Sequence, residues 1–382
     1  MHKNIRILSW FNFFIDFVFY NPIAVLYFAH VTGSYAAAMS IYSVIWLSAA
    51  IFEVPTGVFS DMIGRKNTVI AGALCSTVSV VLYAIGGNYW WLASGALFEG
   101  IGSSFYSGNN DALLHDTVSE TGEVEEYKQY YGKFNSYNQI GLVIVAVSGG
   151  IMANISYALV LWASLIPRLI LVALAFQIVE PKKKSASHTN IYTHMRESLG
   201  QFKVNRKLRL LAIISAMRTA VYEGAFQFRT AFVASLWPLW AVGIAKALSH
   251  LGAAISFHYS GPLLKRFGYK RILVYEIIIN RIINISALLF PSLASPALMS
   301  STSLFYGVTT TAVNSLQQVE FTHVQRATLG SLSSLLGSMA FSISVISLGF
   351  LADRIGPANA LVIAHVSILT VLFLYREFFS SK

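Results

Sequence analysis

Charged side chains inside long apolar segments are the residues of this sequence that could do chemistry. Asp16 and Glu223 each lie near the middle of such a segment, and Asp16 is roughly 12 Å from the start of its own. A charge inside a membrane segment is unfavourable and therefore suggests a function. A carboxyl group in low-dielectric surroundings can take up and release a proton near neutral pH. We therefore expect Asp16 and Glu223 to mediate proton coupling, unless fixed salt bridges give them a purely structural role.

Further charges lie within the apolar segments and divide unevenly between the two halves of the chain. We add Glu99, Arg168, Arg218, Arg229, Lys246 and Arg281 as candidates for a proton or substrate pathway. The first half is mainly acidic and the second mainly basic, which indicates either ion pairs or a cavity for a zwitterionic or anionic solute. Among the aromatic residues, many of which belong at membrane interfaces, we select Tyr20, Phe226 and Tyr306 as candidate lining residues. Glu53, Asp111 and Glu276 lie nearer the segment ends, where gating or snorkelling is expected.

The elements that must hold these charges are membrane helices. The chain has 382 residues, of which 55% are hydrophobic and 12% charged, with a mean hydropathy of +0.60, whereas a soluble globular chain has about 25% charged residues. Runs of about 20 apolar residues, enough to span a bilayer, occur twelve times in two sets of six. The first set covers 7–29, 35–56, 68–87, 89–114, 131–154 and 156–179, and the second covers 208–234, 236–259, 271–291, 295–317, 328–351 and 357–378. We predict an all-α membrane protein with two pseudo-symmetric six-helix bundles, 1–180 and 208–382, joined by a cytoplasmic linker at 181–207.

The distribution of Lys and Arg predicts the orientation of these helices. Most of the 27 basic residues fall at the two termini, in the linker and in loops of the same side, whereas the loops of the other side hold only Arg354. By the positive-inside rule, we expect a multi-pass protein of the cytoplasmic membrane with both termini on the cytoplasmic side. The net charge of +10 therefore does not require a nucleic-acid partner. The single cysteine, Cys75, excludes a disulfide framework and a multi-cysteine metal site.

A compact motif, GVFSDMIGRKN at 57–67, separates the second and third apolar runs. Gly57 precedes Gly64 by seven residues, and a basic pair follows. In the second half, GPLLKRFGYKR at 261–271 keeps the glycine spacing and ends with a similar basic group. Short glycine-plus-basic turns are common, but the matched position in both halves indicates an internal repeat of the kind found in transporters.

This motif resembles the signature between the second and third helices of the major facilitator superfamily. The stretches EVPTG (53–57), SGNNDALLHD (107–116) and QRATLGSLSSLLGS (325–338) resemble bacterial members that are unassigned or grouped with drug exporters. The resemblance implies the major facilitator fold and a cytoplasmic gating loop, which comprises Gly57, Asp61, Gly64, Arg65, Lys66 and Asp116. It implies that Asp61 abuts the start of helix eleven near Thr328 and that Arg65 pairs with Asp116. The alternative is that the basic pair only sets the orientation of the helices.

These features favour a secondary active transporter. We expect it to move a small organic solute across the cytoplasmic membrane by alternating access, driven by protons, with drug or metabolite efflux as the direction. The stretch NQIGLVIVAVSGG (138–150) in the fifth span keeps glycines but lacks the proline of the pattern that proton-coupled drug antiporters of this superfamily usually carry. Uptake or exchange of a charged or zwitterionic metabolite, and a non-transporting sensor on the same scaffold, therefore stay open.

Other function classes have little support in the sequence. No P-loop occurs, and the nine histidines are scattered without an H-E-x-x-H motif. We therefore expect neither ATP hydrolysis nor a membrane-embedded enzyme. The expected partners are the small-molecule substrate, protons and the lipid bilayer, without nucleic acid, metal or cofactor, and we expect a monomer.

Overall fold

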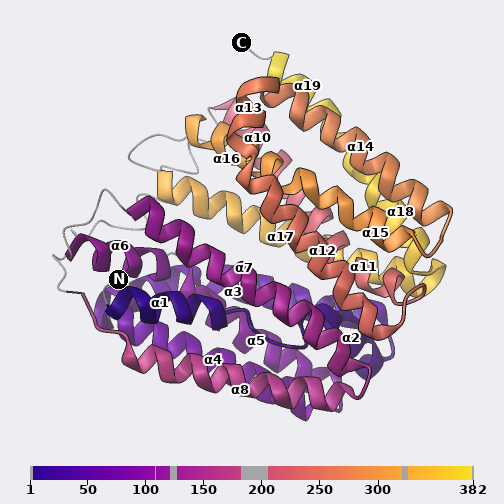
Figure 1. Ribbon diagram of the computed structural model, residues 1–382. Helices are drawn as coiled ribbons and strands as arrows, with labels where there is room; N and C mark the ends of the chain where they lie inside the picture. Colours follow the sequence, from indigo (N-terminus) through magenta and orange to yellow (C-terminus); the bar gives the residue numbers. More distant parts are fainter. Residues whose placement is uncertain (1–2, 108, 121–126, 182–204, 321–325, 381–382) are drawn as a thin grey trace. The chain divides into compact units, whose positions relative to one another are not determined.

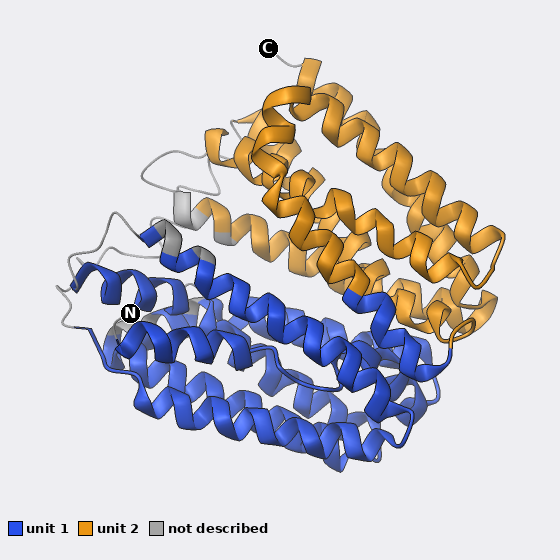
Figure 2. Cartoon of the chain, in the orientation of Figure 1, with its two compact units in different colours: residues 1–185, 238–247 blue, residues 186–237, 248–382 orange. Residues whose placement is uncertain are grey.

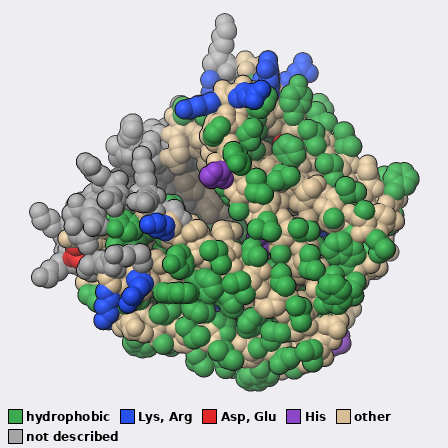
Figure 3. Space-filling view, viewed as in Figure 1, with side chains coloured by type: hydrophobic (Ala, Val, Ile, Leu, Met, Phe, Trp, Pro, Cys, Tyr) green, Lys and Arg blue, Asp and Glu red, His purple; other side chains and the backbone are tan. Residues whose placement is uncertain are grey.

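The computed structural model describes residues 3–107, 109–120, 127–181, 205–320 and 326–380, which are almost entirely helical (Figure 1). Eight described helical segments are long and apolar enough to cross a membrane. They are Tyr35–Glu53, Arg65–Ile85, Lys133–Ala153, Tyr157–Gln177, Leu239–His258, Tyr269–Leu289, Leu332–Ile355 and Pro357–Ser380. Hydrophobic side chains are spread over much of the described surface seen in Figure 3, as suits a lipid environment. The predicted class, an all-α membrane protein, is confirmed.

The chain divides into two compact units (Figure 2). Unit 1 comprises 1–185 and 238–247, and unit 2 comprises 186–237 and 248–382. The predicted linker, 181–207, lies for the most part outside the described residues. The predicted bundle boundaries therefore stay a prediction.

Unit 1 packs the helices of the first half around a buried apolar core. Its elements are α1 (Lys3–Phe14), the 3-10 turn η1 (Asn21–Ile23), α2 (Ala24–Thr32), α3 (Tyr35–Ile63), α4 (Arg65–Ile85), α5 (Tyr89–Tyr106), α6 (Asn109–Glu120), α7 (Tyr127–Ala153), α8 (Tyr157–Gln177) and the start of α12 (Leu239–His258). Polar caps fix several helix starts: the Ser34 side chain accepts from the N–H of Ala37 at α3, and Ser156 accepts from Leu159 at α8. Leu8 of α1 and Leu171 of α8 belong to the core.

The start of α12 belongs to unit 1 because it packs closely on α7. A Cβ at Gly150 would lie 2.7 Å from the carbonyl oxygen of Trp240, and a Cβ at Gly243 would collide with the carbonyl oxygen of Ala146. Glycine at both positions therefore lets the two backbones approach.

Unit 2 holds the helices of the second half. Its elements are α10 (Arg206–Arg218), the π-helical segment η3 (Thr219–Glu223), α11 (Gly224–Val233), the rest of α12, α13 (Ser260–Phe267), α14 (Tyr269–Leu289), α15 (Ser295–Ser301), η4 (Thr302–Phe305), α16 (Tyr306–Glu320), α17 (Arg326–Ile355), α18 (Pro357–Ser367), η5 (Ile368–Thr370) and α19 (Val371–Ser380). Its core includes Leu211 and Ile214 of α10, Ile277 of α14 and Val371 of α19.

Single glycines connect several of these helices. Gly64 joins α3 to α4, Gly268 joins α13 to α14, and Gly356 joins α17 to α18. Their φ angles are 88°, 75° and 83°, with ψ of 159°, 158° and 158°. This backbone conformation is essentially restricted to glycine. The same link therefore recurs between the second and third helices of several three-helix groups, which supports the internal repeat.

Four of the twelve predicted spans are absent from the eight long apolar segments. They are 7–29, formed by α1, η1 and α2; 89–114, formed by α5 and α6; 208–234, formed by α10, η3 and α11; and 295–317, formed by α15, η4 and α16. They are the first, fourth, seventh and tenth spans, one in each group of three. Interrupted helices can place backbone groups and charges at membrane depth, so these four are where a functional site is expected.

Candidate functional site

The first span is interrupted between α1 and α2. α1 ends at Phe14. Helical structure resumes with the 3-10 turn η1 at Asn21, and α-helix with α2 at Ala24. Pro22 stands in the first turn after the interruption, where its missing N–H does not break a helical hydrogen bond. Lipid offers no hydrogen bonds, so the backbone between these points must find partners inside the protein.

Buried side chains of α8 and α12 supply those partners. Arg168 Nη1 donates to the carbonyl oxygen of Ile15 at 2.6 Å, and the Ser164 hydroxyl accepts from the N–H of Phe19 at 2.9 Å. Lys246 Nζ donates to the carbonyl oxygen of Asn21 at 3.1 Å. The end of α1 is the negative end of a helix dipole, which favours a guanidinium there. Arg168 and Lys246 therefore stabilise the non-helical backbone between α1 and α2.

Asp16 lies within the interruption, and its side chain is exposed. Its Oδ2 accepts a hydrogen bond of 2.9 Å from the amide of Asn138 on α7. Within the described part of the chain, no basic nitrogen lies within 4.0 Å of this carboxylate. A fixed salt bridge, the structural alternative for Asp16, therefore finds no support among the described residues.

Glu99 of α5 reaches the residues that follow Asp16. Its Oε2 accepts a hydrogen bond from the Tyr83 hydroxyl at 2.7 Å and a longer one, 3.5 Å, from the Tyr20 hydroxyl. The Tyr20 and Tyr83 rings meet edge to face with centroids 5.4 Å apart. The structure thus brings together two of the predicted residues, Tyr20 and Glu99, and adds Tyr83.

The seventh span carries a different irregularity, the π-helical segment η3. A π-helical turn contains an extra residue, and such turns are rare and frequent at functional sites. Glu223 is the last residue of η3, is half-buried, and its Oε1 accepts from the Tyr306 hydroxyl at 3.1 Å. Tyr306 begins α16, so the structure brings together two predicted residues from the irregular seventh and tenth spans.

For Glu276 of α14, the expectation of a snorkelling side chain is wrong. Glu276 is buried, with an exposed fraction of 0%. Its carboxylate accepts from Arg218 Nη1 at 3.0 Å, from the Tyr222 hydroxyl at 2.5 Å and from Asn280 Nδ2 at 2.7 Å. These three donors compensate the charge in the core of unit 2, which position along the span could not reveal.

Arg229 of α11 supports the tenth span. It donates from Nη1 to the carbonyl oxygen of Met299 at 2.8 Å and from Nη2 to the Ser249 hydroxyl at 2.9 Å. Met299 lies in the last turn of α15, where the helix dipole favours a cation. Phe226 lies one turn earlier on α11, with its ring 5.3 Å from the Arg229 guanidinium carbon. Arg229 therefore caps the end of α15 in the tenth span, as Arg168 caps the end of α1 in the first span.

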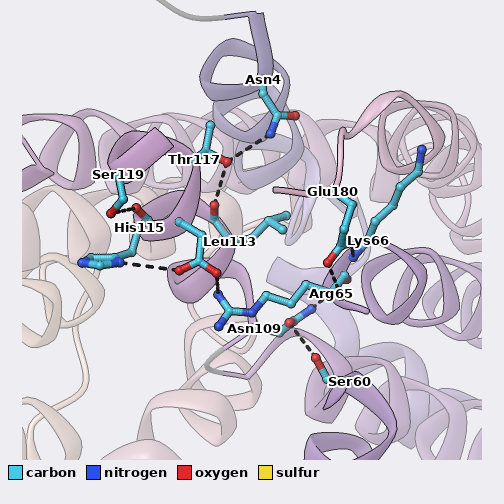
Figure 4. Close-up of polar contacts among 11 residues, drawn as sticks. Asn4, Ser60, Arg65, Lys66, Asn109, Leu113, His115, Thr117, Ser119 and Glu180 are labelled. Carbon is cyan, nitrogen blue, oxygen red and sulfur yellow. Dashed lines mark hydrogen bonds and ion pairs between the residues drawn. The ribbon is translucent and has the colours of Figure 1, made fainter. Parts of the chain in front are cut away.

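Figure 4 shows the loop that joins α3 to α4. Arg65 Nη1 lies 2.8 Å from Asp116 Oδ2 of α6, so the structure brings these two predicted residues together. The Glu180 carboxylate, which sequence reasoning missed, accepts from the backbone N–H groups of Arg65 at 2.9 Å and Lys66 at 2.5 Å. An acidic residue just after the sixth span was the available signal, because a carboxylate stabilises a helix N-terminus.

The remaining predictions for this loop have mixed outcomes. Gly64 makes the positive-φ link described above. Gly57 does not form a turn: it lies inside α3, and no described atom lies within 4 Å of where its Cβ would be. The Asp61 side chain lies outside the described part of the structure, as do the side chains at the start of α17 near Thr328. The proposed contact between them stays a prediction.

The profile described as Major Facilitator Superfamily matches residues 7–344. The chain belongs to the major facilitator superfamily. An uncharacterized MFS-type transporter of Methanocaldococcus jannaschii is 22% identical over 376 residues, which covers 94% of each chain. An uncharacterized transporter of Buchnera aphidicola is 25% identical over 170 residues, or 44% of this chain and 41% of the relative.

Solved structures confirm the major facilitator fold. The nucleoside transporter NupG matches with a TM-score of 0.84 and 15% identity, over 99% of both chains. A bacterial homologue of the lysosomal transporter Spinster matches with a TM-score of 0.75 and 14% identity, over 98% of this chain and 95% of that one. At these identities the likeness shows the fold alone. The protein is thus a multi-pass membrane transporter of a superfamily whose members are generally carriers, not enzymes.

Proposed function

We propose that this transporter moves a small organic solute across the cytoplasmic membrane by alternating access and couples that movement to protons. One observation carries the proposal: the first span of each half loses regular helical geometry at a carboxylate, Asp16 in unit 1 and Glu223 in unit 2. Each carboxylate accepts from a neutral side chain, Asn138 or Tyr306. A neutral donor does not require the carboxylate to be charged, so either group can change protonation while keeping a hydrogen-bond partner.

Glu99 is a third candidate for the proton pathway. It lies on the interrupted fourth span, and Tyr20 connects it to the interruption of the first span. Tyrosine hydroxyls can donate and accept, so they can carry a proton between carboxyl groups. The proposed route in unit 1 therefore runs from Asp16 toward Glu99.

The solute class and the direction need a transport assay. Structural neighbours include a nucleoside transporter and a POT family transporter in complex with 5-aminolevulinic acid, so this fold accommodates unlike solutes. We propose efflux of a drug-like or metabolic solute, with both termini in the cytoplasm and the protein acting as a monomer. Uptake or exchange of a zwitterionic metabolite is the second candidate, because buried basic side chains are numerous in the described core.

The test is solute flux in proteoliposomes with and without a pH gradient, after a thermal-shift panel that includes a nucleoside, 5-aminolevulinic acid and a dipeptide. We expect Asp16→Asn, Glu99→Gln and Glu223→Gln to lower uphill transport by about 100-fold or more, since proton transfer by a positioned group typically contributes that much. Glu377→Gln is the matched control, because that carboxylate forms an exposed ion pair with Arg206. Uphill transport by all three variants at the rate of the control would refute proton coupling at these residues.

A further inference from the structure

A second cluster of buried polar side chains lies in the core of unit 2, around the Tyr222 ring. The guanidinium carbons of Arg218 and Arg281 lie 4.6 Å and 4.7 Å from its centroid. Arg281 is 4% exposed, and it lies on α14 beside Asn280 and one turn after Glu276. Two guanidinium groups and one carboxylate therefore share a small volume of low dielectric.

The charges in this cluster do not balance. Glu276 pairs with Arg218, whereas the Arg281 guanidinium donates from Nη1 to the ring Nδ1 of His365 on α18, at 2.9 Å. A guanidinium has no acceptor, so His365 must accept through an unprotonated Nδ1 and brings no negative charge. In the described parts of the chain, no carboxylate oxygen lies within 4.0 Å of Arg281. One positive charge in the cluster is left over.

Hydrogen bonding at this point is also incomplete. The Arg281 Nε–H, a donor, is buried and has no hydrogen-bond partner in the described structure. A buried charge is unfavourable unless it is paired and hydrogen-bonded. Arg168 Nε is also buried without a partner in the part of the chain that is described, but Arg168 and Arg229 each donate from Nη1 to a backbone carbonyl at a helix end. Among the described residues, Arg281 donates to the His365 ring and not to a carbonyl at a helix end, so a cap does not account for its charge.

We propose that Arg281, with the neutral His365 ring beside it, binds a compact monovalent anion in the core of unit 2. One excess charge fits one negative charge, supplied either by the carboxylate of a small solute or by chloride. Arg281 Nε offers a donor to that anion. The inference does not depend on proton coupling and extends beyond the proposed function, because it assigns a ligand to a cluster formed by the irregular seventh span, α14 and α18.

The test is thermal unfolding of the full-length purified protein in detergent, titrated separately with sodium acetate and sodium chloride. Sodium HEPES at equal ionic strength is the control for general ionic screening, because its anion is too bulky for the proposed site. We expect a saturable rise in Tm with acetate or chloride in the parent and in Arg354→Gln, a charge-matched control whose guanidinium lies on the Phe350 ring. Arg281→Gln should lose that rise. A larger effect of acetate would identify a solute carboxylate, and a larger effect of chloride would identify a free halide.

Glu276→Gln provides a second and opposite test. It removes the one carboxylate of the cluster, so the excess charge rises and the half-saturating anion concentration should fall at least about fivefold. An anion-dependent rise in Tm that survives in Arg281→Gln, or that HEPES reproduces in the parent, would overturn the proposal. So would an unchanged half-saturating concentration in Glu276→Gln. Flux measurements enter none of these outcomes, so the anion site and proton coupling can fail separately.

Discussion

At the scale of single residues, buried basic side chains in this transporter have unlike roles although they look alike in the sequence. Arg168 closes the end of α1 through the Ile15 carbonyl, and Arg229 closes the end of α15 through Met299. Arg218 is held by the Glu276 carboxylate. The partner decides the role: a carbonyl at a helix end makes the cation a cap, and a carboxylate makes it half of an ion pair.

The cap at Arg168 can be tested by removing its donors. Arg168→Met retains an unbranched side chain but leaves the partly buried Ile15 carbonyl without this donor, which costs about 1–3 kcal/mol. We expect a clear fall in Tm of the purified protein, smaller for Arg168→Lys because an ammonium can still donate. Arg354→Met, which removes an arginine at the end of α17, serves as the control. A Tm for Arg168→Met equal to that of this control would show that the interruption needs no cap.

At the scale of elements, a single glycine decides how α3 turns into α4. Gly64 has φ 88° and ψ 159°, and the Glu180 carboxylate lies against it. The carboxylate accepts from the first N–H groups of α4, so the turn and the cap are built together. Gly57, seven residues earlier, has ordinary helical surroundings inside α3.

These two glycines therefore predict opposite results for the same substitution. Gly64→Ala forces a Cβ into a glycine-only conformation and places it 3.2 Å from Glu180 Oε1, with an expected cost of about 1–3 kcal/mol. Gly57→Ala meets no described atom and should be neutral or stabilise α3 by up to about 1 kcal/mol. Thermal unfolding of the two variants side by side measures the difference. If both variants lose the same Tm, the positive φ of the turn does not explain why glycine is needed at position 64.

The sequence predicted these elements well where the pattern is local. Apolar runs located the helices, and glycine spacing located the link at Gly64. Hydropathy could not show that the first span breaks after Phe14, because the break depends on Arg168 and Ser164, which lie far away in the chain. The Asn21-Pro22 pair was a local signal of that break. Nor could position along a span show that Glu276 is buried, since Arg218 compensates it from another helix.

At the scale of the whole molecule, alternating access requires contacts that exist in one state and not in the other. The ion pair of Arg65 with Asp116, and the cap that Glu180 makes on α4, join elements of unit 1 alone. An interaction inside one rigid unit contributes equally to both states, so it cannot shift the balance between them. These contacts therefore shape the loop, and the state-dependent contact proposed for the loop must come from another residue.

Asp61 is that residue in our proposal, because the family motif implies a contact with the start of helix eleven, which belongs to unit 2. A carboxylate at a helix N-terminus contributes about 1 kcal/mol, or about fivefold in an equilibrium between two states. Asp61→Asn should therefore raise the ratio of inward-open to outward-open protein about fivefold and slow turnover, with little change in solute affinity within either state. The measurement is the labelling rate of a cysteine placed on the inner cavity wall in a Cys75→Ser background. Glu377→Gln, which neutralises an exposed carboxylate paired with Arg206, is the control. If Asp61→Asn is labelled at the same rate as the parent and the control, Asp61 has no part in gating.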